Sequence, residues 1–174
     1  MNSTPILLEL FCGLSGWSKG FHLEGWHTIG VDWLDFSASA PGQFIQADLR
    51  TWQPPAQLRV TLIIASPPCQ EYSRMSMPWT RARNPPPPST ELWNAALRIA
   101  NSILARCIIE NVRGAQAYHR RSVLNYGAFH LWGDVPALIP SGRNAPKERL
   151  SSTQAQERAI VPIELSRWLA RVCK

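Results

Sequence analysis

The strongest constraint on the fold is a series of short apolar segments, each followed at once by glycine or by polar residues. Residues 60–65, Val-Thr-Leu-Ile-Ile-Ala, are nearly all apolar, which is typical of a strand in a parallel sheet covered on both faces. The same reasoning predicts further strands over residues 6–10, 28–31, 44–46, 107–109 and 129–132.

Helical patterns alternate with these strands. We expect helices over residues 17–23, from Leu92 to Ile103 after a cap at Ser89, and from Pro162 to Val172. Between them, residues 69–88 are irregular and end in four prolines. A chain of 174 residues with this alternation predicts one α/β domain, a Rossmann-like, doubly wound and mostly parallel sheet spanning residues 1–174.

The polar groups of interest all follow predicted strands. They are the glycine-rich turn at 11–16, Asp32, Asp48, Cys69 and Glu110. Ligands of open α/β sheets bind at the carboxyl ends of the strands, so we expect these five elements to share one edge. Glycines at 13 and 16 let a ligand approach the backbone, and Asp32 suits the hydroxyls of a ribose. An ordinary tight turn is the alternative.

Two of these residues have unusual settings. Cys69 follows two prolines and precedes Gln70 and Glu71, a poor environment for a core thiol, which favours an exposed nucleophile over a buried cysteine. Glu110 follows an apolar strand, where a protonated carboxyl group could donate a hydrogen bond. The alternative there is a carboxylate that accepts from backbone amides.

The net charge of +6 lies entirely in the last third of the chain. Residues 1–112 carry 8 basic and 8 acidic side chains, whereas residues 113–174 carry 10 basic and 4 acidic ones. A basic segment suits a polyanion such as nucleic acid, although an ordinary solubility charge explains it about equally well.

Other classes are disfavoured. The four cysteines and four histidines show no metal-site spacing, so no metal is expected. No apolar run approaches the roughly 20 residues of a membrane span, and the N-terminus does not resemble a secretory signal. We therefore expect thiols in a reducing compartment.

Five segments resemble, in order, the motifs of the DNA (cytosine-5)-methyltransferases. Residues 8–16, Leu-Glu-Leu-Phe-Cys-Gly-Leu-Ser-Gly, resemble the first motif, and 31–33, Val-Asp-Trp, the second. Residues 47–49, Ala-Asp-Leu, resemble the third. Residues 66–73, Ser-Pro-Pro-Cys-Gln-Glu-Tyr-Ser, are similar to the nucleophile motif, and 110–112 to the family's Glu-Asn-Val. Residues 159–165 resemble the terminal motif that returns to the cofactor.

The resemblance implies the class I fold and S-adenosylmethionine as cofactor. Asp32 would bind the ribose with Trp33 against the adenine, while Asp48 would bind the adenine amino group and Leu49 pack on the ring. The remaining cofactor residues would be Phe11, Gly13, Leu14, Ser15, Gly16 and Pro67.

The same resemblance implies the chemistry. Cys69 would attack carbon 6 of cytosine, and Glu110 would protonate or hydrogen-bond ring nitrogen 3. Gln70, Ser73 and Asn111 would complete the catalytic site. The target base must leave the duplex first.

Residues 71–88 correspond to the family's mobile catalytic loop. Its arginines suit phosphates, and Met75, Met77 and Trp79 suit the space left by a flipped base. The residues we expect at nucleic acid are Arg74, Arg81, Arg83, Arg113, Arg120 and Arg121.

The chain departs from the family pattern after residue 114. Only residues 133–157 stand where the family inserts a recognition domain, and its Gln-Arg-x-Arg motif is not recognisable, with Gln116, Arg120 and Arg121 as loose substitutes. Small enzymes of this outline resemble those carried by bacteriophages, and this resemblance implies the cytoplasm of a bacterial or phage-infected cell. We therefore expect a minimal enzyme that methylates double-stranded DNA in a short or relaxed sequence context.

Three alternatives remain open at this point. The chain could be a catalytic subunit whose recognition part is a separate polypeptide. It could be a binding protein that kept the cofactor fold, although a binder has no need of both Cys69 and Glu110. A tRNA substrate is a further enzymatic alternative.

Overall fold

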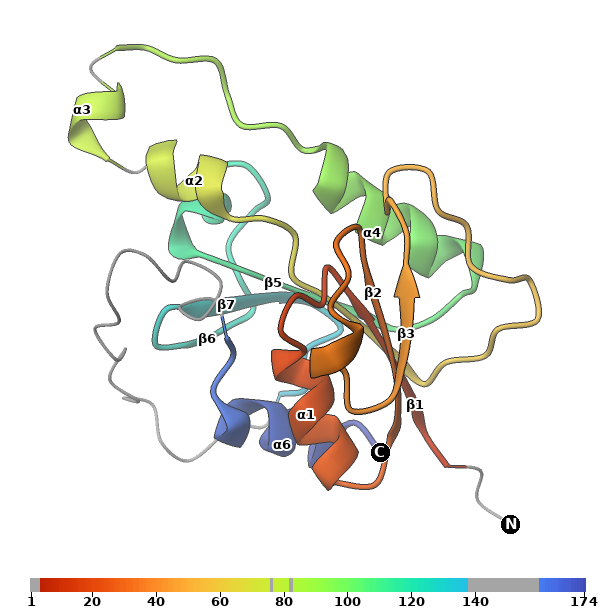
Figure 1. The fold of residues 1–174 in the computed structure, drawn as a ribbon. Helices are drawn as coiled ribbons and strands as arrows, with labels where there is room; N and C mark the ends of the chain where they lie inside the picture. The colour runs from red at the N-terminus through yellow and green to blue at the C-terminus, as the bar shows by residue number, and fades with distance from the viewer. Residues whose placement is uncertain (1–3, 76, 82, 138–159) are drawn as a thin grey trace.

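The computed structural model describes residues 4–75, 77–81, 83–137 and 160–174. Within these residues seven strands form one sheet in the order β3-β2-β1-β4-β5-β7-β6 (Figure 1). The strands are β1 (Ile6–Leu10), β2 (His27–Asp32), β3 (Gln43–Gln46), β4 (Leu62–Ala65), β5 (Cys107–Asn111), β6 (Leu124–Tyr126) and β7 (Phe129–Gly133). The first five pair in parallel, and β7 pairs antiparallel with both β5 and β6.

This architecture confirms the predicted α/β class with a doubly wound, mostly parallel sheet. The central strands are apolar throughout because both of their faces are covered. Alternate residues of β4 contribute to two different cores, Ile63 and Ala65 to one, Leu62 and Ile64 to the other.

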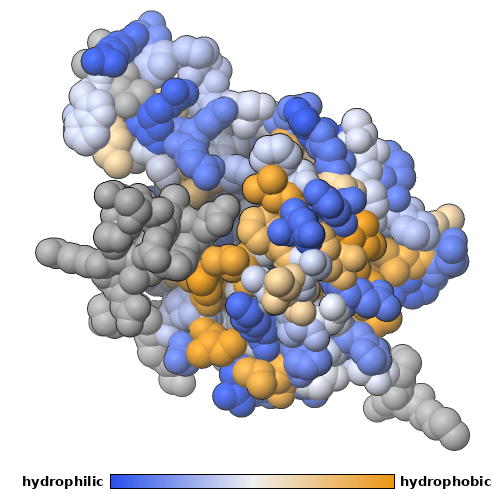
Figure 2. Space-filling model, viewed as in Figure 1, coloured by the Kyte–Doolittle hydropathy of each residue, from blue (hydrophilic) through white to orange (hydrophobic). Residues whose placement is uncertain are grey.

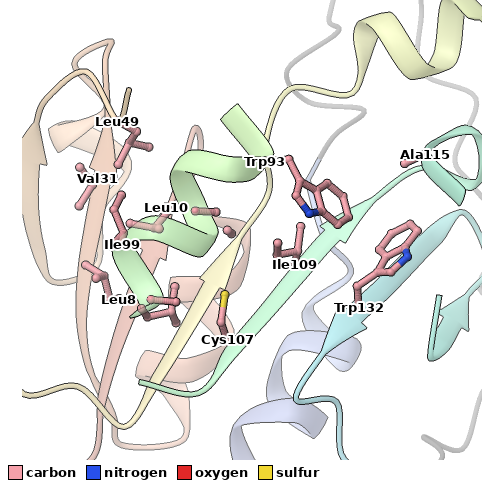
Figure 3. Packing of buried hydrophobic residues seen from close by; sticks show 14 of the residues in the cluster. Leu8, Leu10, Val31, Leu49, Trp93, Ile99, Cys107, Ile109, Ala115 and Trp132 are labelled. Carbon is pink, nitrogen blue, oxygen red and sulfur yellow. The ribbon is translucent and has the colours of Figure 1, made fainter. Parts of the chain in front are cut away.

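Helices α1 (Gly16–Leu23) and α6 (Ile163–Val172) cover one face of the sheet and pack against each other (Figure 1). The two helices approach closely at Gly20, where an added Cβ would lie 2.2 Å from Oγ of Ser166. Helix α4 (Glu91–Ser102) covers the other face, where Ile99 and Trp93 pack over the strands (Figure 3).

Three details differ from the sequence expectations. The irregular segment contains two short helices, α2 (Gln70–Met75) and α3 (Pro78–Arg81). Strand β6 was not expected, because it is three residues long with an exposed middle residue. Helix α4 is capped at Thr90 rather than Ser89, although the Ser89 hydroxyl still accepts a hydrogen bond from the backbone N–H of Glu91 at 3.2 Å.

The described residues also include two 3-10 turns, η1 (Ser37–Ser39) and η2 (Arg113–Ala117). Most of the segment 133–157, expected in place of a recognition domain, lies outside the described residues. Among the described helices, none combines the length and hydrophobicity needed to cross a membrane.

Candidate functional site

The polar elements predicted from the sequence gather at one edge of the sheet. The strand order reverses at β1, which lies between β2 and β4, so the loops that leave β1 and β4 diverge. The register pairs Leu10 with Ala65 and Ala65 with Ile109. The glycine-rich loop, the turn that carries Cys69 and the end of β5 that carries Glu110 therefore begin side by side.

The glycine-rich loop has a strained backbone. Phe11, Gly13 and Ser15 have φ values of 57°, 46° and 58°, in the left-handed region that side chains disfavour. A Cβ added to Gly13 would meet no atom within 4 Å, so this part of the loop faces open space. Gly16 lies against the last segment, where an added Cβ would be 2.9 Å from the backbone nitrogen of Val161.

Asp32 supports this loop from the end of β2. Its carboxylate accepts hydrogen bonds from the backbone N–H of Gly13 at 3.0 Å and of Leu34 at 3.2 Å, and the residue is buried. Trp33 follows and is 67% exposed, so its ring offers a flat apolar surface beside the loop.

The third predicted cofactor motif is arranged differently from the first two. Asp48 forms an ion pair with Arg50, whose guanidinium lowers the pKa of the carboxyl group. Leu49 is buried and packs with Leu8 and Val31 in the core under α4 (Figure 3). In this structure the Asp48 carboxylate thus faces a cation and Leu49 faces the core.

Glu9 is a buried carboxyl group that sequence reasoning did not single out. It accepts hydrogen bonds from the backbone N–H groups of Trp17 at 3.2 Å and Ser18 at 2.8 Å, in the first turn of α1. Burial raises its pKa from 4.5 to about 7. The signal that could have found it is a lone carboxylate inside an apolar strand just before a helix start.

The turn that carries Cys69 is held by Asn111. The Asn111 amide donates a hydrogen bond to the Pro67 carbonyl oxygen at 2.8 Å, and its own oxygen accepts from the N–H of Val112 at 2.9 Å. Asn111 is 1% exposed, so this link between the ends of β4 and β5 is shielded from water. Cys69 itself is half-buried, and its carbonyl oxygen accepts from the N–H of Ser73 at 2.9 Å.

A cluster of aromatic rings anchors α2, the helix that begins directly after Cys69. The hydroxyl of buried Tyr72 lies 2.6 Å from Nε2 of His119, and the His119 ring stacks on Trp93 with centroids 3.7 Å apart. Trp93 in turn meets the edge of Trp132, as Figure 3 shows. Burial lowers the pKa of His119, which favours the neutral ring. No sequence pattern predicted this cluster.

The two ends of the predicted catalytic loop meet at Ser89. The Glu71 carboxylate accepts a hydrogen bond from the Ser89 N–H at 2.6 Å, and the Tyr72 hydroxyl lies 3.3 Å from the Ser89 carbonyl oxygen. We call these contacts the loop clasp. Helices α2 and α3 extend from it beyond the sheet (Figure 1), and Figure 2 shows that their outer surface is largely hydrophilic.

Most of the predicted nucleic-acid residues are exposed on this side of the molecule. Turn η2 packs tightly on α2, because a Cβ on Gly114 would lie 2.6 Å from the carbonyl oxygen of Tyr72. Arg74 and Arg113 are therefore carried by neighbouring segments. Of the predicted nucleic-acid residues, the structure shows five as exposed, namely Arg74, Arg83, Arg113, Arg120 and Arg121, whereas the Arg81 side chain lies outside the described part of the chain.

Gln116 forms a hydrogen bond within the protein, to Ser122. Its side-chain oxygen accepts from the N–H of Ser122 at 3.1 Å, and the Ser122 hydroxyl lies 2.9 Å from Nδ1 of His130. The Gln116 side chain therefore closes the turn between η2 and β6. No group of three or more potential metal ligands occurs in the described part of the chain.

Comparisons with known proteins concern the fold. Neither a protein-family model nor a curated protein matches the sequence. Among solved structures, the chain is similar to a candidate DNA modification methyltransferase encoded within an E. coli prophage, with a TM-score of 0.50 and 19% identity over 64% of this chain and 33% of that one. Dnmt2 of S. pombe matches with a TM-score of 0.46 and 18% identity over 66% of this chain and 36% of that one.

The chain spans about a third of the length of these two structures. The likeness to the prophage protein, together with the strand order and the reversed β7, identifies the architecture as the class I methyltransferase fold. At 19% identity this likeness shows the fold alone.

The buried Glu9 carboxyl group predicts a pH-dependent stability. The folded protein keeps the Glu9 carboxyl group protonated to a higher pH than the unfolded chain does. The stabilisation that protonated Glu9 contributes is therefore fully present below pH 4.5 and is lost as the pH rises through about 7. Relative to Glu9→Gln, the wild-type free energy of unfolding should fall by about 3 kcal/mol across this window, measured by urea denaturation.

Glu24→Gln is the matched control. Glu24 is a surface carboxylate whose hydrogen bonds to Arg171 and Arg167 lower its pKa to about 2, so its contribution should be lost toward acid pH instead. Parallel wild-type and Glu9→Gln stability curves between pH 4.5 and 7 would contradict the assignment.

Proposed function

We propose that the chain is an S-adenosylmethionine-dependent methyltransferase that acts on carbon 5 of cytosine in DNA through a covalent adduct of Cys69. The observation that carries the proposal is the Asn111–Pro67 hydrogen bond, which joins the Cys69 turn to the strand end that bears Glu110. A thiol just after one strand and a carboxyl group near the end of the adjacent parallel strand, beside a glycine-rich loop, are the set that this reaction needs.

The residues at the glycine-rich loop fit S-adenosylmethionine. The space in front of Gly13 leaves room for a ligand against the backbone, and Trp33 offers a ring face for an adenine. Asp32 is buried at the end of β2, where its carboxylate would accept a hydrogen bond from a ribose hydroxyl. When bound, this cofactor supplies an electrophilic methyl group.

The roles of the remaining cofactor residues are part of this proposal. Leu14, Ser15 and Gly16 would border the ligand through the loop, and Phe11 and Pro67 would close its sides. Asp48 would bind the adenine amino group only if it exchanges or shares its ion pair with Arg50. Leu49 would support the ring from the core, where it lies already.

The protein's own groups then act on the base. The Cys69 thiolate adds to carbon 6 of cytosine, and the electron pair of the carbon 5–carbon 6 double bond moves toward nitrogen 3. Glu110 hydrogen-bonds or protonates nitrogen 3 and so stabilises the charge that develops on the ring. Carbon 5 thereby becomes nucleophilic. After carbon 5 is substituted, loss of its proton restores the double bond and expels Cys69.

Gln70, Ser73 and Asn111 support Cys69 in different ways. Asn111 fixes the turn before it, and Ser73 donates its N–H to the Cys69 carbonyl oxygen within α2. Gln70 is exposed directly after the nucleophile, where it would face the substrate.

The proposed substrate is double-stranded DNA. The exposed arginines that flank α2 and η2 would bind its phosphates, and the exposed ring of Trp79 on α3 would contact the opened duplex. With no more than residues 133–157 in place of a recognition domain, we propose a short or relaxed sequence context.

Methyl transfer from labelled S-adenosylmethionine to unmethylated DNA tests the reaction. We expect label in 5-methylcytosine, and Cys69→Ser should reduce the rate on the order of 10³-fold or more because the nucleophile is lost. Cys173→Ala is the matched control, because that buried thiol lies at the end of α6 and should leave the rate unchanged.

Product analysis separates the alternatives. Bisulfite sequencing that shows methylation only within one long motif would overturn the relaxed context. Label that appears in tRNA rather than DNA would change the substrate, and activity only after a second polypeptide is added would show a catalytic subunit. A folded protein that binds the cofactor and transfers no methyl group under any of these conditions would be a binding protein.

Asp32→Ala tests the cofactor site. Because Asp32 both holds Gly13 and would accept from the ribose, we expect the affinity for S-adenosylmethionine to fall by about 10- to 100-fold in calorimetric titrations. Asp35→Ala is the control, since the exposed Asp35 accepts hydrogen bonds from Ser37, two residues away. Equal affinities of the two variants would argue against the site.

Arg120→Gln with Arg121→Gln tests the nucleic-acid surface. If both guanidinium groups contact phosphates, the slope of log affinity against log salt should become shallower by about 2, roughly 0.9 per lost contact. Arg59→Gln removes one charge near the opposite end of the strands and should leave the slope unchanged. A double variant with the wild-type slope would exclude these two residues from the interface.

A further inference from the structure

Trp17 bonds to three separate segments through its three polar groups. Its backbone N–H donates to Glu9 at 3.2 Å, its carbonyl oxygen accepts from the Ser166 hydroxyl at 2.6 Å, and its indole N–H donates to the Ser66 hydroxyl at 3.1 Å. Trp17 is 1% exposed and stands in the first turn of α1, directly after the glycine-rich loop. Its ring is therefore fixed in both position and direction.

Ser66 is the first residue of the turn that leads to Cys69. Its backbone N–H donates to the carbonyl oxygen of Leu10 at 3.1 Å, and its hydroxyl accepts from the indole. The next residue, Pro67, is the one held by Asn111. Pro67 and Pro68 have fixed φ angles, so only their ψ angles can absorb a displacement at Ser66, and part of it reaches Cys69.

We propose that Trp17 is a positioning residue for the nucleophile, because its indole N–H holds the turn at Ser66 and thereby sets where the Cys69 thiol stands relative to the glycine-rich loop. The inference rests on the proposed function for its catalytic meaning, whereas the placement of the thiol is a property of the chain itself. Asn111 holds the same turn from β5, so the turn is fixed from both sides.

The alternative is that Trp17 only fills the core, and Trp26 provides the comparison. Both indoles are buried in the same apolar cluster, and each donates one hydrogen bond of 3.1 Å. The acceptor of Trp26 is the carbonyl oxygen of Ala170 in α6, away from the Cys69 turn. Trp26→Phe and Trp17→Phe therefore both replace a buried indole by a phenyl ring and remove one indole hydrogen bond. They differ in the segment that loses this bond, which is α6 for Trp26 and the Cys69 turn for Trp17.

The rate at which iodoacetamide alkylates Cys69 reports the placement of the turn without cofactor or DNA. Peptide mass spectrometry separates Cys69 from Cys12, Cys107 and Cys173, which are buried. Trp17→Phe should raise the Cys69 rate by about fivefold, because one hydrogen bond no longer restrains the turn. Trp26→Phe should keep the wild-type rate.

Ser66→Ala removes the same bond from the other side with little change of the core, and it decides the matter if Trp17→Phe folds poorly. It should reproduce the increase, and the double variant should add nothing to it. A wild-type alkylation rate in Ser66→Ala, an equal increase in Trp26→Phe, or additive effects would each overturn the proposal.

Methyl transfer gives the second readout. Trp17→Phe and Ser66→Ala should lower kcat by about tenfold or more while KM for S-adenosylmethionine stays near the wild-type value, because a misplaced nucleophile slows chemistry and not binding. A wild-type chain that transfers no methyl group while the alkylation pattern holds would overturn the proposed function and leave the positioning role standing. If the wild type is active but the variants show unchanged alkylation, the positioning role would be overturned and the proposed function would stand.

Discussion

The register between β1, β4 and β5 is the constraint on which the rest of the structure depends. Leu10 lies beside Ala65 and Ala65 beside Ile109, so the segments that follow leave the sheet at one level. A slip of two residues would preserve the apolar faces and still move one segment by about 6.6 Å along its neighbour. Hydrogen bonds such as that from Asn111 to Pro67 form only in the observed register.

Buried carboxyl groups hold the part of this edge that is under strain. Phe11 and Ser15 adopt left-handed backbone conformations that cost side-chain-bearing residues roughly 1 kcal/mol or more each. Asp32 binds the N–H of Gly13 between them, and Glu9 binds the first turn of the helix that follows. The strained loop thus lies between two anchors, each buried where water does not compete for its hydrogen bonds.

The sequence predicted the central strands well, because a strand buried on both faces must be apolar along its whole length. It also predicted which edge would carry the polar residues, since strand ends and motifs coincided. Strand β6 escaped prediction, as did α2 and α3, because segments of three to six residues carry too little periodicity to be recognised.

The contacts between distant residues could not be read from the sequence either. Trp17 and Ser66 are 49 residues apart, and Tyr72 and His119 are 47 apart, so only the folded sheet brings each pair together. Glu9 and Asn111 were visible as polar residues within apolar segments. Their hydrogen-bond partners depend on how α1 and the Cys69 turn are placed against the strands.

The loop clasp has an evolutionary consequence. Because Glu71 and Tyr72 meet Ser89, the chain that leaves α2 returns to the point from which it started, and the positions of its two ends do not depend on its length. Lengthening such a closed loop costs little, about 0.6 kcal/mol for each doubling of its length. Insertions, deletions and exchanges between the two ends are therefore tolerated without moving the sheet edge, so the length of this segment is independent of the rest of the fold.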